Sequence, residues 1–141
     1  MASILLIDDN VAFGEIAASV LRSAGHTVWP CASGKAGFGR MREHPVDLVI
    51  TDIVMPDQDG LEILMELRKT HPHVKVIMMS GDNPERASFY LSVGHKLGAV
   101  RTLLKPFPLK TLLTTVAEVL HPDAATPLSA ASGTGTLEGP V

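Results

Sequence analysis

Polar residues that can do chemistry stand directly after four short apolar runs of the sequence. Asp8 and Asp9 follow the first run, Thr51-Asp52 ends another, and Ser80 and Lys105 follow two later ones. Carboxylates that lie close together repel one another, which raises the pKa of at least one of them unless a cation lies among them. Oxygen ligands of this kind suit Mg²⁺, a hard ion that keeps part of its water shell. The set therefore indicates a site for a hard divalent cation.

The same residues also suit the stabilisation of a phosphoryl group. A carboxylate such as that of Asp52 can act as a nucleophile and form an aspartyl-phosphate. The hydroxyl of Ser80, the ammonium of Lys105 and a bound Mg²⁺ would then offset the charge on the phosphoryl oxygens. A single aspartate at such a position is usually only a turn residue or a helix cap. Polar residues at four strand ends are much harder to explain in that way.

An alternation of strands and helices must bring these residues together. The apolar runs are short and lie at 4–7, 27–29, 46–50, 74–79 and 99–104. Several of them are apolar at consecutive positions, which is typical of strands buried on both faces of a parallel sheet. Helical spacing follows each run, at 10–25, 33–42, 60–70, 83–96 and 108–121. The segment 33–42 is the poorest helix, because each of its three glycines costs ~1 kcal/mol relative to alanine. The pattern predicts an α/β domain over residues 3–121, whose ligands bind at the carboxyl ends of the strands.

Composition and charge exclude several classes of protein. The 141 residues contain 12 Lys plus Arg and 15 Asp plus Glu, a net charge of −3 without the basic excess of a nucleic-acid binder. The single cysteine, Cys31, excludes an internal disulfide framework. No apolar run is long enough to cross a membrane and no signal peptide is evident, so we expect a cytoplasmic protein. Residues 122–141 are rich in Ala, Ser, Thr, Gly and Pro and are predicted to be a disordered tail.

The motifs around the polar residues resemble those of the receiver domains of bacterial two-component response regulators. They are Leu5-Leu6-Ile7-Asp8-Asp9-Asn10, Asp52-Ile53-Val54-Met55-Pro56-Asp57-Gln58-Asp59-Gly60, Met79-Ser80-Gly81 and Leu104-Lys105-Pro106-Phe107. The resemblance covers residues 3–121. It implies a flavodoxin-like, doubly wound sheet of five parallel strands in the order 2-1-3-4-5, with five helices. It also implies a cis peptide bond between Lys105 and Pro106.

The resemblance further implies a metal site and a phosphorylation site that share one residue. Asp52 would be the phosphoacceptor. Asp8, Asp9, Asp52 and the backbone carbonyl of Val54 would hold Mg²⁺.

By the same resemblance, Lys105 would contact the phosphoryl group and the hydroxyl of Ser80 would follow it as part of a switch. The phosphoryl group would come from a sensor histidine kinase or a histidine phosphotransfer protein. The chain would be no enzyme beyond assisting its own phosphorylation and dephosphorylation.

The residues after 121 are too few and too polar for a DNA-binding domain, so we expect a stand-alone regulator. Its signal would leave by contact with a downstream protein that the sequence does not identify, and not through nucleic acid or membrane.

One position departs from the family pattern. Receiver domains usually carry Tyr or Phe three residues before the lysine, and that ring moves inward when the Ser/Thr moves. Here the residue is Thr102. We therefore expect the switch at Ser80 and Thr102 to act through backbone shifts at 80–83 and the face formed by 99–103.

Two alternatives of other classes remain open. The chain could be a pseudo-receiver that binds partners without being phosphorylated. A phosphohydrolase with an aspartyl-phosphate intermediate fits less well, because such enzymes carry Asp-x-Asp after the first strand, whereas this sequence has Asp8-Asp9-Asn10.

Overall fold

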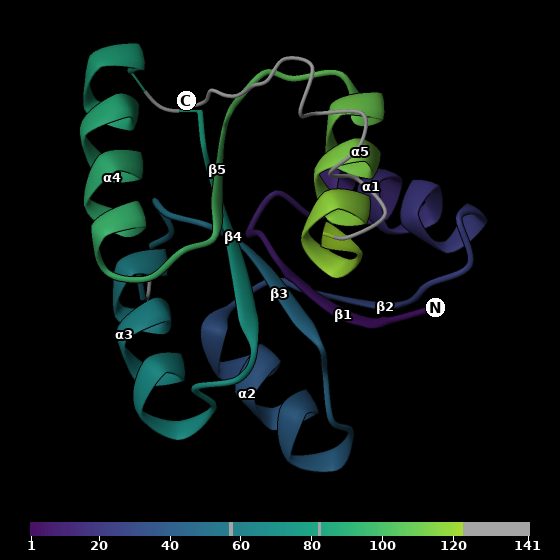
Figure 1. The fold of residues 1–141 in the computed structure, drawn as a ribbon. Coiled ribbons are helices and arrows are strands. Elements are labelled where there is room, and N and C mark those ends of the chain that lie inside the picture. The colour runs from purple at the N-terminus through teal and green to yellow at the C-terminus, as the bar shows by residue number, and fades with distance from the viewer. Residues whose placement is uncertain (57, 82, 123–141) are drawn as a thin grey trace.

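Parallel strands form a single sheet at the centre of the protein (Figure 1). The computed structural model describes residues 1–56, 58–81 and 83–122. Within these residues the sheet has five strands in the order β2-β1-β3-β4-β5, all paired in parallel. The strands are β1 (Ser3–Ile7), β2 (Thr27–Cys31), β3 (Leu48–Asp52), β4 (Lys75–Ser80) and β5 (Arg101–Leu104). The expected fold class and strand order are confirmed, while the tail predicted at 122–141 lies, from residue 123 on, outside the described residues.

Helices cover both faces of this sheet (Figure 1). They are α1 (Val11–Ser23), α2 (Gly34–Glu43), α3 (Gly60–Thr70), α4 (Pro84–Lys96) and α5 (Leu109–Leu120). Helices α1 and α5 pack on one face, and α2, α3 and α4 pack on the other. None of the helices in the described part of the chain has the length and apolar character needed to cross a bilayer.

The uninterrupted apolar runs exist because the central strands are buried on both faces. In β1, Leu5 and Ile7 belong to the core beneath α2 and α3, whereas Ile4 and Leu6 belong to the core beneath α1 and α5. Successive side chains of a strand point to opposite faces of a sheet, so a strand between two layers of helices needs apolar residues at every position. All five residues of β3 are buried, including Asp52. The sequence pattern is therefore a direct consequence of the three-layer architecture.

Pairing of the strands brings their carboxyl ends to one edge of the sheet. In register, Ile7 lies opposite Thr51, and Asp52 lies opposite Met79. Ser80 lies opposite Leu104, the residue that precedes Lys105. The polar residues identified in the sequence consequently share this edge.

Strand β5 begins at Arg101, two residues after the start expected from the apolar pattern. The backbone reverses at Gly98, whose φ is 118°, a conformation that L side chains rarely adopt. The N–H of Ala99 then donates to the carbonyl oxygen of Gly94 at 3.0 Å and closes the end of α4. Ala99 is buried, so its apolar character serves the core and not the strand.

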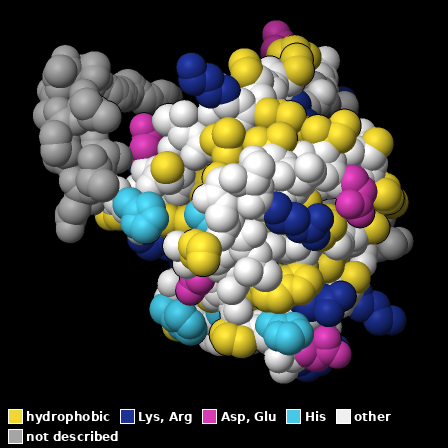
Figure 2. All heavy atoms as spheres, turned by 90° about the vertical axis from the view of Figure 1, so that its right-hand side faces the viewer, with side chains coloured by type: hydrophobic (Ala, Val, Ile, Leu, Met, Phe, Trp, Pro, Cys, Tyr) yellow, Lys and Arg dark blue, Asp and Glu magenta, His cyan; other side chains and the backbone are white. Residues whose placement is uncertain are grey.

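The outer face seen from the α1 and α5 side carries charges of both signs. Figure 2 shows basic, acidic and apolar side chains interspersed on this face, without one large area of a single sign. A surface of this kind favours solubility and gives no strong field in one direction.

Two glycines of helix α2 differ in the space available for a side chain. A Cβ atom at Gly37 would lie 2.9 Å from Cδ1 of Ile7, whereas the nearest atom to one at Gly39 would be Nη2 of Arg42 at 3.6 Å. We expect Gly39→Ala to raise the free energy of unfolding by about 0.5–1 kcal/mol, because alanine loses less backbone entropy. Gly37→Ala should lower it by about 1 kcal/mol through overpacking. Chemical denaturation measures both, and destabilisation by Gly39→Ala would contradict this account.

Candidate functional site

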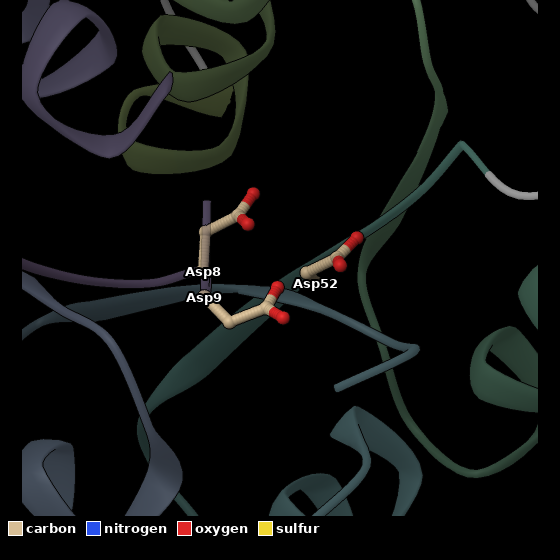
Figure 3. Close-up of side chains that lie close together, drawn as sticks. All are labelled: Asp8, Asp9 and Asp52. Atoms are coloured by element: carbon tan, nitrogen blue, oxygen red, sulfur yellow. The ribbon is translucent and has the colours of Figure 1, made fainter. Parts of the chain in front are cut away.

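Three carboxylates meet at the carboxyl edge of the sheet (Figure 3). Asp8 and Asp9 follow β1, and Asp52 is the last residue of the adjacent strand β3. One oxygen atom from each lies within 4.8 Å of the others. Asp8 and Asp52 are buried, with 3% and 8% of their surface exposed, whereas Asp9 is exposed. This is an oxygen-only donor set that could hold a metal ion.

The ammonium of Lys105 lies among these carboxylates. Its Nζ is 2.6 Å from Oδ2 of Asp8, to which it donates a hydrogen bond, and 3.6 Å from Oδ1 of Asp52. The lysine is brought there by β5, the edge strand beside β4. It is followed by a cis peptide bond to Pro106, which confirms what the family resemblance implied. Asp8 is therefore the main partner of the ammonium in this structure, and Asp52 is the weaker one.

Burial sets the acidity of Asp52. It raises the pKa of this carboxyl from 3.8 to about 6, since a buried group is harder to ionise. The nearby ammonium of Lys105 lowers the pKa, and the carboxylates of Asp8 and Asp9 raise it. Asp52 is thus largely ionised at neutral pH, at a cost in free energy that an added cation beside it would reduce.

An open pocket of about 450 Å³ surrounds the cluster. Its lining comes from the ends of several strands and comprises Asp8, Asp9, Asn10, Asp52, Val54, Gly81, Lys105 and Pro106. Gly81 allows the chain after β4 to pass close to the lysine, because a Cβ atom there would lie 2.5 Å from Cβ of Lys105. The pocket has room for a phosphoryl group and a hydrated cation beside Asp52.

The two residues expected to form a switch, Ser80 and Thr102, are not among the residues that line this pocket. Ser80 is the last residue of β4 and is fully buried, and its Oγ has no hydrogen-bond partner among the described residues. A buried hydroxyl without a partner is costly, so a change that supplies an acceptor would be favoured. Thr102 is half-buried on β5, opposite Met78. Their roles in switching stay predictions.

Two neighbours of the site were not singled out as functional from the sequence. The N–H of Asn10 donates to Oδ1 of Asp8 at 2.9 Å, and Oδ1 of Asn10 accepts from the N–H of Phe13 at 3.0 Å. Asn10 is the N-cap of α1, at the start of the helical spacing seen at 10–25. Phe13 lies in the first turn of that helix, and its ring packs against the Lys105 ammonium. The sequence shows the spacing from the cap residue Asn10 to Phe13, but it does not show the contact of Phe13 with Lys105, 92 positions away.

Comparison with known proteins gives consistent matches. A family model described as response regulator receiver domain matches residues 4–117. The sensor kinase CckA of Brucella abortus is 42% identical over 122 residues, which cover 85% of this chain and 13% of the kinase. The DNA-binding transcriptional regulator NtrC of Azospirillum brasilense is 33% identical over 132 residues, which cover 92% of this chain and 27% of the regulator. The chain thus spans well under a third of the length of these relatives.

Solved structures resemble the whole described fold. A CheY-like response regulator receiver domain protein from Methanospirillum hungatei superposes with a TM-score of 0.77 at 27% identity, covering 88% of this chain and 97% of that one. The receiver domain of NtrX from Brucella abortus gives a TM-score of 0.76 at 27% identity, with coverage of 84% and 98%.

Proposed function

Because the chain belongs to the family of response regulator receiver domains, we propose that Asp52 accepts a phosphoryl group from a phosphohistidine. One observation carries this proposal. The carboxylate of Asp52 lines an open pocket in which the ammonium of Lys105 lies 3.6 Å away and further carboxylates lie beside it. A nucleophile, a fixed cation and ligands for a second cation are what phosphoryl transfer to a carboxylate requires.

The transfer itself needs little covalent chemistry from the protein. A carboxylate oxygen of Asp52 attacks the phosphorus atom and forms the P–O bond, while the P–N bond to the imidazole breaks. The electron pair of that bond stays on the imidazole nitrogen, and the imidazole leaves with the proton of its other nitrogen in place. Lys105 lies close enough to Asp52 to donate to a phosphoryl oxygen there, and Asp8 orients the ammonium.

The residues at the site fit Mg²⁺. Asp8, Asp9 and Asp52 supply oxygen donors within 4.8 Å of one another, and Val54, whose backbone carbonyl the family resemblance adds, lines the same pocket. When bound, Mg²⁺ would offset the negative charge of the phosphoryl oxygens and of the carboxylates. Binding of Mg²⁺ and phosphorylation are typical of this family.

The proposed partners are those that fit the chemistry of the site. The donor would be a sensor histidine kinase or a histidine phosphotransfer protein, and the signal would leave by contact with a downstream protein in the cytoplasm. The protein would act as a phosphoacceptor that assists its own phosphorylation and dephosphorylation, and not as an enzyme on free substrates. Relatives named as a sensor kinase and as a DNA-binding regulator support a place in two-component signalling without naming the pathway.

Incubation of the protein with acetyl phosphate and Mg²⁺ tests the proposal. We expect intact-mass spectrometry to show the addition of one phosphoryl group, which hydroxylamine removes and which EDTA prevents. Borohydride reduction and peptide mapping should place the group on Asp52. A folded protein that gains no phosphoryl group would contradict the proposal and would favour a pseudo-receiver that binds partners without phosphorylation. Rapid turnover of phosphate esters would instead favour a phosphohydrolase.

A further inference from the structure

The aromatic ring of Phe13 is a third neighbour of the Lys105 ammonium, beside the carboxylates of Asp8 and Asp52. Nζ of Lys105 lies 4.4 Å from the centroid of this ring. The other two neighbours are carboxylate oxygen atoms, Oδ2 of Asp8 at 2.6 Å and Oδ1 of Asp52 at 3.6 Å. A cation over the face of an aromatic ring within about 6 Å is attracted by the negative face of the π-system.

The position of the ring is fixed from two sides. Oδ1 of Asn10 accepts a hydrogen bond from the N–H of Phe13, which anchors the first turn of α1. The ring of Phe107 meets that of Phe13 edge-on, with centroids 6.1 Å apart and an interplanar angle of 89°. Edge-to-face packing of this kind is a favoured arrangement of aromatic rings.

These contacts close a cycle around the site. Asp8 accepts from the backbone of Asn10, Asn10 caps Phe13, Phe13 underlies Lys105, and Lys105 donates back to Asp8. The lysine arrives from β5 and the other three residues from β1 and the start of α1. The ring therefore ties the ammonium to the segment that carries Asp8.

We infer that Phe13 is a positioning residue that holds the Lys105 ammonium between Asp8 and Asp52. The inference rests on the proposed phosphorylation of Asp52. An ammonium has three N–H donors and no acceptor, and a ring face attracts it without a strong directional hydrogen bond. The ammonium can thus keep one donor on Asp8, turn another toward a phosphoryl oxygen on Asp52, and remain on the ring throughout. An oxygen acceptor in place of the ring would compete for those donors.

Variants of Phe13 test the inference. Phe13→Leu keeps an apolar side chain but has no π-face, whereas Phe13→Tyr keeps the ring. We expect Phe13→Leu to slow phosphorylation by acetyl phosphate at saturating Mg²⁺ about two- to fivefold, the size of a partly exposed cation–π contact. Phe13→Tyr should restore the wild-type rate, and Ile16→Ala, at an exposed position of the same helix, should leave the rate unchanged. Equal rates for Phe13→Leu and wild type, or an equal loss in both Phe13 variants, would overturn the inference.

A spectroscopic measurement separates this inference from the proposed function. The ring current of Phe13 should shift the εCH₂ proton signals of Lys105 upfield in the wild-type protein. The shift should disappear in Phe13→Leu and persist in Phe13→Tyr, while thermal unfolding shows that each variant is folded. Failure of the wild type to be phosphorylated would defeat the proposed function and leave this test intact. If the wild type showed no upfield shift, or if Phe13→Leu kept it, the inference about Phe13 would be overturned while the proposed function would stand.

Discussion

Asp52→Asn is expected to abolish phosphoryl incorporation and at the same time to stabilise the folded protein. An amide at this position cannot form an acyl phosphate under these conditions, so acetyl phosphate should add no phosphoryl group. The amide also carries no charge, whereas the carboxylate it replaces is buried beside Asp8 and Asp9. Residues needed for chemistry are often costly to the fold, and their replacement commonly exchanges activity for stability.

The sign of the stability effect follows from the pKa of Asp52. Burial raises it from 3.8 to about 6, so the folded protein binds a proton more tightly than the unfolded chain does. The resulting contribution to stability is fully present below about pH 4 and is lost as the pH rises through about 6. A pKa difference of this size corresponds to at most about 3 kcal/mol, and the open pocket reduces the expected effect to about 1–2 kcal/mol.

Denaturant unfolding of wild type and Asp52→Asn without divalent cations measures this effect. The stability advantage of the variant should grow between pH 4 and pH 7 and then stay constant. Asp9→Asn is the matched control, because it removes one charge from the same cluster and leaves the nucleophile in place. That variant should still be phosphorylated, but at a higher Mg²⁺ concentration, because one oxygen donor for the ion is weakened. An advantage for Asp52→Asn that shrinks with rising pH would show that the carboxylate is not penalised by burial.

Most residues of the site could be predicted from the sequence, because in a parallel sheet one simple rule decides which residues lie together. Once apolar runs are recognised as buried strands, residues at their carboxyl ends must share one edge of the sheet. Asp8, Asp9, Asp52 and Lys105 all meet there. The strands themselves were clear because burial on both faces leaves continuous apolar segments.

Details that depend on side-chain conformation and on tertiary packing could not be predicted in this way. The choice of Asp8 over Asp52 as the main partner of Lys105 depends on differences of about an ångström. The complete burial of the Ser80 hydroxyl depends on packing around β4. The contact of Phe13 with Lys105 joins α1 to the end of β5, and an amphipathic pattern records only that a residue faces inward.

Replacement of Lys105 should show how strongly the phosphorylation of an intact Asp52 depends on the ammonium beside it. We expect Lys105→Met to lower the rate of phosphorylation by about 10²–10³, the usual cost of removing a group that stabilises developing charge. The folded protein without divalent cations should lose about 2–3 kcal/mol, because the buried carboxylate of Asp8 loses its partner at 2.6 Å. Since the ammonium and a divalent cation compete for the same oxygens, the affinity for Mg²⁺ should rise.

The changes in stability and in Mg²⁺ affinity show whether the Lys105 ammonium shares the carboxylate oxygens with the metal ion or only forms a structural ion pair. Calorimetric titration with Mg²⁺ should give tighter binding to Lys105→Met than to wild type, and saturating Mg²⁺ should return most of the lost stability through binding to the folded state. Lys110→Met, at an exposed position of α5, controls for the loss of a surface charge and should change neither quantity. If Lys105→Met bound Mg²⁺ no more tightly, the ammonium would not share the carboxylate oxygens with the ion. The Asp8–Lys105 pair would then be a structural ion pair, and the lysine would have to act on the phosphoryl group from another position.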